Sequence, residues 1–191
     1  MAIDTGLAVS CDDLRASGGI QEIAIREYED TDVIAFGTAH NITGYDTSGS
    51  TEDFWAVFEF KNETPALTIT GTKENGTTSF EIGLTFTIPL IDGAKMLELQ
   101  KLSDDKCLVA IVRTVNGENL VFGVSQRYAY ETTLPNNQTF ASLSGFEGGT
   151  GAAYSDENNM TVSLTCKQFE LPRQYTGTFD ANHTTLQAST T

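Results

Sequence analysis

Residues 80–88 constrain the fold more than any other segment of the chain. From Phe80 onward every second residue is large and apolar, and the residues between them are Glu, Gly or Thr. This period-two alternation lasts nine residues and predicts a long β-strand with one face in a core. Pro89 ends the strand. The polar face of the strand carries Ser79, Glu81, Gly83, Thr85 and Thr87.

A second alternating strand is expected just before the first. Residues 66–71 also alternate, and Asn75-Gly76 lies between the two segments. Asn-Gly supplies the positive φ angles that a tight turn needs, so residues 66–88 read as a hairpin. Thr68 and Thr70 would then join the polar face of the partner strand.

Further apolar or alternating segments predict additional strands. They are residues 23–25, 33–36, 54–60, 107–115, 120–122, 128–131 and 160–166. Asn116-Gly117 predicts a second hairpin. Apolar residues spaced by three predict one helix over residues 92–102, with Asp92 capping its start. Residues 133–155 read as a long glycine-rich loop, of a kind that is usually functional or held by a partner.

These elements predict a mostly β fold. We expect an antiparallel β-sandwich or barrel with one short α-helix and extended N- and C-terminal arms. The expected division is an N-terminal arm over residues 1–19, a β-sandwich over 20–172 and a C-terminal arm over 173–191.

The charge of the chain limits its partners. Acidic residues outnumber basic ones by 26 to 11, which gives a formal net charge of −15. Gripping nucleic acid requires a stripe of Lys and Arg, and anionic membranes also attract basic surfaces, so neither is an expected partner. We find no apolar run of eighteen residues and no basic leader, so we expect no spanning helix and no signal peptide.

No catalytic, metal or cofactor motif stands out. The two histidines, His40 and His183, have no nucleophile motif beside them, and the three cysteines lie far apart. The run from Gly148 to Gly151 lacks the Lys-Ser/Thr pair of a phosphate loop, and residues 156–159 lack the spacing of a calcium loop. We therefore expect no enzyme, no cofactor and no metal.

Two alternatives stay open from the residues alone, one catalytic and one for binding. Carboxylates such as Glu59 and Glu81 could meet in space as a glycosidase pair, although exposed acids on strands are usually only solvated. Trp55 and the tyrosines could form a platform on which sugars stack, although a lone Trp in an apolar strand is usually part of the core.

The order of these segments resembles that of phage tail tube (major tail) proteins, which have the Hcp-like tube fold. The resemblance covers about residues 50–172. It rests on the hairpin 66–88, the helix 92–102, the strand 107–115 with its Asn116-Gly117 turn, and the stretch from the glycine-rich run 148–151 to the strand 160–166.

The resemblance implies a structural virion protein located in the phage tail and made in the bacterial host cytoplasm. Such subunits form rings, usually hexamers, that stack into a tube and conduct the genome. The implied partners are further copies of the chain, other tail proteins at the tube ends, and DNA that passes without specific binding, with no membrane involved. Lumen-facing candidates are Thr68, Thr70, Ser79, Glu81, Thr85 and Thr87; inter-subunit loop candidates are Gly145, Gly148, Gly149 and Gly151.

Other functions fit the same pattern. Within virions, the chain could be a tail terminator, a collar protein or a capsid decoration protein. Outside virions, it could be a carbohydrate-binding β-sandwich module. A tube subunit would polymerise, a terminator would stop at one ring, and a carbohydrate-binding module would stay monomeric with exposed aromatic side chains.

Overall fold

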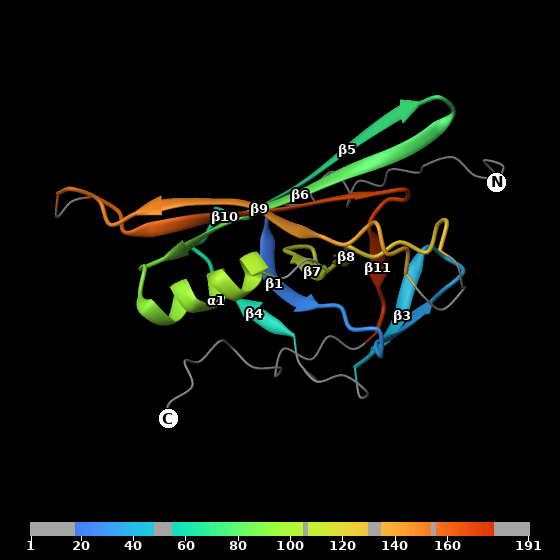
Figure 1. The fold of residues 1–191 in the computed structure, drawn as a ribbon, viewed down its shortest axis with the longest axis horizontal. Helices are drawn as coiled ribbons and strands as arrows, with labels where there is room; N and C mark the ends of the chain where they lie inside the picture. Colours follow the sequence, from blue (N-terminus) through green and yellow to red (C-terminus); the bar gives the residue numbers. More distant parts are fainter. Residues whose placement is uncertain (1–17, 48–54, 105–106, 130–134, 154–155, 178–191) are drawn as a thin grey trace.

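Two β-sheets and one helix make up the described part of the chain, which covers residues 18–47, 55–104, 107–129, 135–153 and 156–177 of a computed structural model (Figure 1). The expected mostly β fold with one short helix is confirmed. The smaller sheet spans the top of the view in Figure 1, and the helix lies below one end of it.

The smaller sheet has four antiparallel strands in the order β5-β6-β10-β9. Their bounds are Ala66–Glu74 for β5, Thr77–Pro89 for β6, Ser142–Gly149 for β9 and Asn159–Gln168 for β10. The β5–β6 turn is formed by Asn75 and Gly76, with φ angles of 48° and 82°. Both are left-handed, as the Asn-Gly pair predicted. β6 and β10 pair without a break from Asn159 opposite Pro89 to Gln168 opposite Phe80.

The larger sheet has seven strands in the order β2-β3-β11-β8-β7-β1-β4. Their bounds are Ile20–Glu27 (β1), Val33–Phe36 (β2), Asn41–Asp46 (β3), Ala56–Phe58 (β4), Leu108–Thr114 (β7), Asn119–Phe122 (β8) and Arg173–Tyr175 (β11). β11 runs parallel to β3 and antiparallel to β8, so it joins the β2–β3 hairpin to the rest of the sheet.

The main core fills the space between the two sheets. The apolar residues from Ile82 to Ile88 of β6 and from Met160 to Cys166 of β10 are buried there against β1 and β7. Phe58 meets Phe86 edge-to-face, with ring centroids 5.8 Å apart. Helix α1 (Gly93–Asp104) closes one end of this core with Leu99 and Leu102. Its start is capped as predicted, because the Lys95 amide donates to Asp92 Oδ1 at 2.9 Å.

A second core lies on the other face of the larger sheet. Val109, Ile111 and Val121 from β7 and β8 pack there with Ile34 of β2 and Ile42 of β3. The larger sheet is therefore apolar on both faces. This explains why residues 107–115 read as a nearly continuous apolar run instead of alternating.

Three expectations about element positions were wrong. Residues 142–149 of the expected loop 133–155 form strand β9. Its Ser and Gly residues carry no apolar alternation, and the strand is held by its ladder with β10. The expected C-terminal arm begins with β11, which the sheet holds on both sides. The expected strand 128–131 begins in a turn, where Tyr128 has a φ of 64°.

Several expected features fall wholly or partly outside the described residues. These are most of both arms (residues 1–17 and 178–191), together with Phe54 and residues 130–131. Strand β3 pairs with β2 and β11 in the larger sheet, although no sequence pattern predicted this strand.

A buried ion pair links β1 to the loop before β2. The Arg26 guanidinium donates to both carboxylate oxygens of Asp32, at 2.8 and 3.2 Å, and the two side chains are 1% and 0% exposed. Asp32 also accepts from the Tyr45 hydroxyl at 2.9 Å. Burial, followed by the charge of Asp32 and this hydrogen bond, raises the pKa of Tyr45 far above its usual range. Both carboxylate oxygens of Asp32 thus accept hydrogen bonds, as a buried charge requires.

Removing one partner of this pair is expected to be costly. Asp32→Ala removes the carboxylate that accepts two hydrogen bonds from the buried Arg26 guanidinium, and we expect the free energy of unfolding to fall by about 3–5 kcal/mol. Urea denaturation measures the change. As a control, Lys101→Ala breaks the exposed Lys101–Glu98 pair on α1 and should cost less than about 1 kcal/mol. Similar losses in both variants would contradict the role assigned to Asp32.

Candidate functional site

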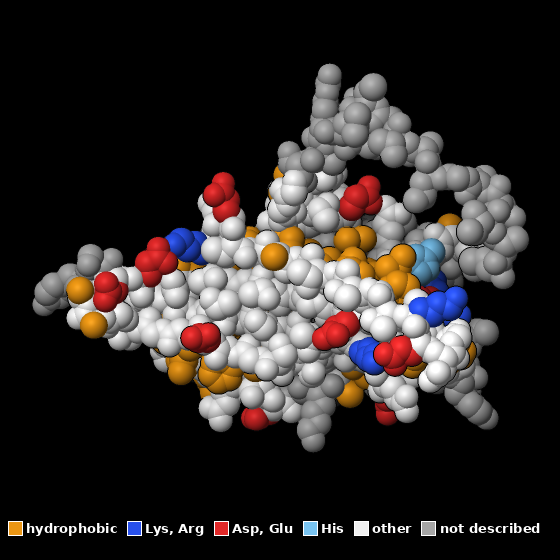
Figure 2. Space-filling model, turned by 90° about the horizontal axis from the view of Figure 1, so that it is seen from above, with side chains coloured by type: hydrophobic (Ala, Val, Ile, Leu, Met, Phe, Trp, Pro, Cys, Tyr) orange, Lys and Arg blue, Asp and Glu red, His pale blue; other side chains and the backbone are white. Residues whose placement is uncertain are grey.

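The outer face of the four-stranded sheet is covered by small hydroxylated side chains. We call it the hydroxyl face. Its members are Thr68, Thr70, Thr72, Ser79, Glu81, Thr85, Thr87, Thr161, Ser163, Thr165 and Lys167. The view from above in Figure 2 shows this side of the molecule as largely white, with scattered charged side chains. The opposite face of the same strands forms the core.

Strand register gathers the six lumen-facing candidates on the hydroxyl face. Thr70 lies opposite Glu81, and Thr68 lies opposite Gly83. Ser79, Thr85 and Thr87 share the parity of Glu81 along β6, and the residues of opposite parity from Ile82 to Ile88 are buried. The candidates are therefore neighbours in space, as the sequence alternation predicted.

Contacts between neighbouring strands join the side chains of the hydroxyl face. The hydroxyls of Thr87 and Thr161 lie 3.1 Å apart, and Thr68 donates to the carbonyl of Gly83 at 3.2 Å. A Cβ at position 83 would lie only 2.9 Å from the Thr68 hydroxyl oxygen. Glycine at this position thus makes room for the threonine of the neighbouring strand.

Charge is sparse on this face. Away from the hairpin tip, the charged side chains are Glu81 on β6, Glu147 on β9 and Lys167 on β10. Glu81 and Lys167 lie opposite each other in the ladder. The face therefore offers many hydroxyl groups but little net charge to whatever lies above it.

The four-stranded sheet has two borders to which no strand of the described part of the chain is paired. They are the outer borders of β5 and β9. β5 has nine residues and contains neither proline nor a bulge. An edge of this kind exposes backbone donors and acceptors that can template pairing with another chain.

Each open border also exposes one large apolar residue on the core side of the sheet. Ile69 of β5 lies opposite Ile82 and is 44% exposed; Phe146 of β9 lies opposite Val162 and is 52% exposed. Both partners are fully buried. The apolar layer of the core thus continues to both borders of the sheet, where its last residues are uncovered.

The four glycines expected in an inter-subunit loop fall into two groups. A Cβ at Gly148 would lie 2.3 Å from the carbonyl of Asn159, and Gly151 has a φ of 73° with Asp156 beside it. These two glycines are required by contacts within the chain. Gly145 and Gly149 have open space where a Cβ would stand, so they leave β9 accessible. Gly145, Gly148 and Gly149 lie on β9 rather than in a loop.

The other candidate residues do not form a site. Trp55 is half-buried and meets Tyr45 edge-to-face at 5.1 Å, so it belongs to the second core. The His40 ring contacts the carbonyl of Leu171 at 3.0 Å, and His183 lies outside the described residues. Burial raises the pKa of the Cys166 thiol to about 12.

Asp156 belongs to the 156–159 turn that was considered for calcium. Its carboxylate accepts from the amides of Ala152 and Ala153, both at 2.8 Å, and these bonds lower the pKa of its carboxyl. In the part of the chain that the structure describes, no three His, Cys, Asp or Glu side chains gather as metal ligands. Within the same residues, no helix has the length and apolar character needed to cross a membrane.

Comparisons of this chain with protein-family models, with curated proteins and with solved structures find no match.

The two faces of β6 should differ sharply in their tolerance of substitution. Glu81→Gln changes an exposed side chain on the hydroxyl face, and we expect the free energy of unfolding to change by no more than about 0.5 kcal/mol. Phe86→Ala empties a fully buried site on the same strand and should cost about 3–5 kcal/mol. Thermal or urea unfolding measures both. Equal losses would show that Glu81 is not on an open face.

Proposed function

We propose that this chain is a structural, non-enzymatic subunit that assembles with copies of itself into rings, as a tail tube subunit of a phage virion does. One observation carries the proposal. Among the described strands, none pairs with either outer border of the four-stranded sheet; an apolar residue is exposed at each border, and the hydroxyl face lies between them.

Pairing β5 of one copy with β9 of the next would satisfy both borders at once. The backbone groups of the two strands would complete each other's ladder, which is how strand addition gives affinity. Ile69 and Phe146 would then meet at each junction and be withdrawn from water. Because the two borders differ, the contact is heterologous, and such contacts close into a ring when the rotation between copies allows it.

Ring closure would build a continuous barrel wall from four strands of every copy. The helix and the larger sheet cover the apolar side of this wall, so the hydroxyl face is the side left for the lumen. Stacked rings would form a conduit for the genome, with other tail proteins at its ends.

The hydroxyl face suits a wall along which DNA slides. Lysines and arginines lining a channel would bind phosphates, since non-specific binding to DNA reaches dissociation constants of about 10⁻⁴ to 10⁻⁶ M. Here the face holds mainly hydroxyls, and the chain carries a net charge of −15. Duplex DNA would therefore meet few cations and a repulsive overall field.

Charge at either open border is expected to prevent assembly. Ile69→Lys and Phe146→Lys each place a cation where the junction must bury an apolar side chain, at a cost of several kcal/mol per junction. Purified protein should form rings or tubes in negative-stain images, and each variant should stay monomeric by mass photometry. Val115→Lys changes an equally exposed residue in the β7–β8 turn and should assemble normally.

Mixing the two border variants provides a stricter test. One intact β5 remains on the Phe146→Lys copy and one intact β9 on the Ile69→Lys copy, so an equal mixture should form dimers that cannot grow. Dimers in the mixture but not in either variant alone would support β5–β9 pairing. A wild-type chain that stays monomeric at high concentration, or a mixture that remains monomeric, would contradict the proposal.

Reversing one charge on the hydroxyl face should make the assembled wall bind DNA. Six or so copies of Glu81→Lys would ring the lumen with lysines, next to Lys167 on the neighbouring strand. We expect assemblies of this variant to retain short duplex DNA with an affinity that falls steeply as salt rises. Glu59→Lys makes the same charge change beyond the four-stranded sheet, and equal binding by both variants would contradict the assigned lumen face.

A further inference from the structure

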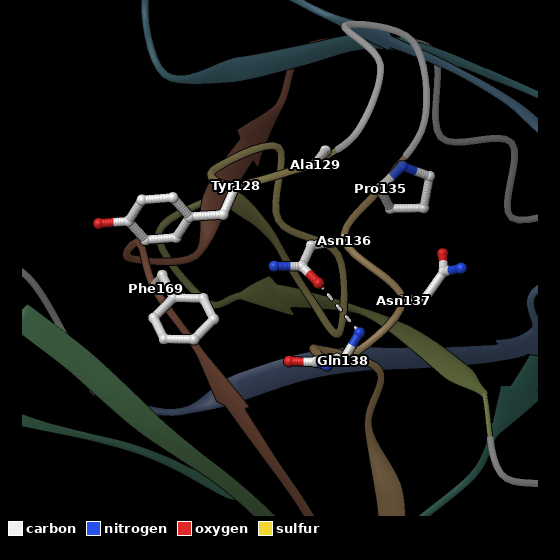
Figure 3. Close-up of a pocket in the computed structure, with 7 residues that line it drawn as sticks. All are labelled: Tyr128, Ala129, Pro135, Asn136, Asn137, Gln138 and Phe169. Carbon is white, nitrogen blue, oxygen red and sulfur yellow. Dashed lines mark hydrogen bonds between the residues drawn. The ribbon is translucent and has the colours of Figure 1, made fainter.

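An open pocket lies where the neighbouring segments 128–129 and 135–138 meet Phe169, which is distant in sequence. Its volume is about 560 Å³, within the usual range for small-molecule sites. The described residues that line it are Tyr128, Ala129, Pro135, Asn136, Asn137, Gln138 and Phe169 (Figure 3). They combine two aromatic rings, a proline and three side-chain amides, and none of them carries a formal charge.

Tyr128 is the most unusual residue of this pocket. Its side chain is 64% exposed, and its φ of 64° is rare for a bulky residue. The Arg127 guanidinium lies over the ring, 5.3 Å from its centroid, and the Phe169 ring meets it in an edge-to-face arrangement with centroids 5.2 Å apart. The phenol ring is thus held by two neighbours and is still largely exposed to solvent. Strained residues of this kind gather at functional sites.

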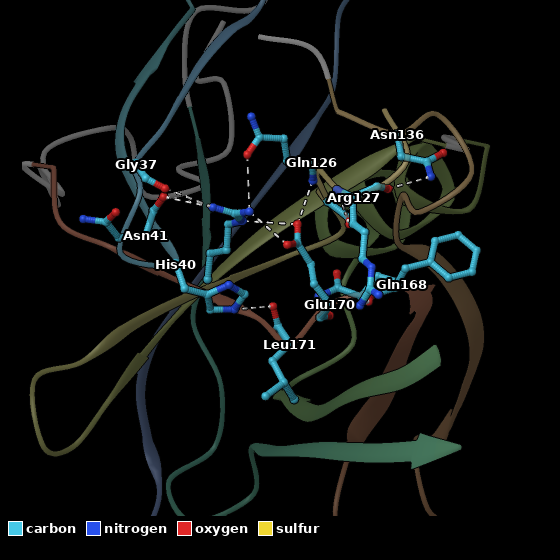
Figure 4. A network of polar contacts seen from close by, with 12 residues as sticks. Gly37, His40, Asn41, Gln126, Arg127, Asn136, Gln168, Glu170 and Leu171 are labelled. Atoms are coloured by element: carbon cyan, nitrogen blue, oxygen red, sulfur yellow. Dashed lines mark hydrogen bonds and ion pairs between the residues drawn. The ribbon is translucent and has the colours of Figure 1, made fainter. Parts of the chain in front are cut away.

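A polar network fixes the three segments that build the pocket (Figure 4). Asn136 donates from its side chain to the Arg127 carbonyl at 3.2 Å, and Arg127 donates to the Phe169 carbonyl at 3.2 Å. The Gln126 amide donates to Glu170 at 2.7 Å. Burial raises the pKa of Glu170, but hydrogen bonds from Arg173 and Gln126 outweigh it, so this pKa is lowered and the group stays ionised. The pocket is therefore preorganised, which favours binding.

The three side-chain amides of the pocket differ in their hydrogen bonds to the rest of the chain. Asn136 is committed to the network, since it also accepts from the Gln138 backbone amide at 3.1 Å. The side-chain amides of Asn137 and Gln138 make no hydrogen bond to the described part of the chain. An amide offers two donors and a carbonyl acceptor, so it can bond adjacent hydroxyls of one ligand.

We propose that this pocket binds a neutral saccharide, with one sugar ring stacked on the exposed ring of Tyr128 and its hydroxyls bonded by Gln138. The uncharged lining disfavours phosphates and other ions. A proline-rich peptide would need a ridge of side-by-side rings. The planes of Tyr128 and Phe169 stand at 82° to each other, so the two rings do not form such a ridge. The proposal does not depend on ring assembly.

The test is a titration of the full chain with neutral gluco-, manno-, galacto- and N-acetylglucosamine oligosaccharides, followed by calorimetry and saturation-transfer NMR. Both the wild-type chain and the Ile69→Lys variant are used, so that binding is read with and without assembly. We expect at least one oligosaccharide to bind both proteins. Titration up to about 10 mM detects dissociation constants in the millimolar range. If none of the oligosaccharides binds at that concentration, the proposal is overturned.

Tyr128→Gly separates a binding role from a structural one. Glycine adopts the φ of position 128 freely, so the variant should not unfold at a lower temperature, whereas loss of the ring should weaken saccharide binding by about tenfold or more. Gln138→Ala should weaken binding less, and Leu97→Ala, which removes an exposed apolar side chain of α1, should leave it unchanged. Unchanged binding by Tyr128→Gly, or displacement of the saccharide by a proline-rich peptide, overturns the proposal.

Discussion

The pairing of β6 with β10 is the interaction on which the rest of the structure depends. Ten consecutive residue pairs run from Pro89–Asn159 to Phe80–Gln168 without a shift in register. Because the register is unbroken, every apolar side chain of both strands faces the same way, and these side chains form the floor of the main core. The same register collects the threonines and serines on the opposite side. A slip by one residue would bury the hydroxyls and expose the core, so one constraint sets both faces of the sheet.

The parts of the fold that could be predicted are those that have a clear local pattern in the sequence. β5, β6 and their turn follow from strict alternation and from Asn75-Gly76, and the placement of the six lumen-facing candidates on the hydroxyl face follows from the same pattern. β9 could not be found in this way, because a run of Ser and Gly gains its order from the ladder with β10 rather than from its own side chains. β3 and β11 are short, and each is held by pairing with strands on both of its sides. Hydrophobic periodicity carries no information about such partnerships.

The pocket was hidden from the sequence for a different reason. Phe169 lies far along the chain from Tyr128, and hydrogen bonds from Arg127 to the Phe169 carbonyl and from Gln126 to Glu170 bring the two segments together. Trp55, the aromatic residue that the sequence suggested for stacking, is held in the second core by Tyr45. A residue type can suggest a platform, but exposure depends on packing against distant segments. The open borders and the pocket involve different residues, so assembly and ligand binding can be varied separately.

The central position of β11 has a consequence for how the protein is made. Arg173 is 7% exposed, pairs with Glu170 at 2.9 Å and stacks on Phe36, so β11 locks the β2–β3 hairpin into the larger sheet. This sheet therefore stays incomplete on the ribosome until synthesis has passed Tyr175. The β5–β6 hairpin emerges long before that point, with its edge open. During that interval the nascent chain carries an exposed strand edge, at which premature pairing with other chains can begin.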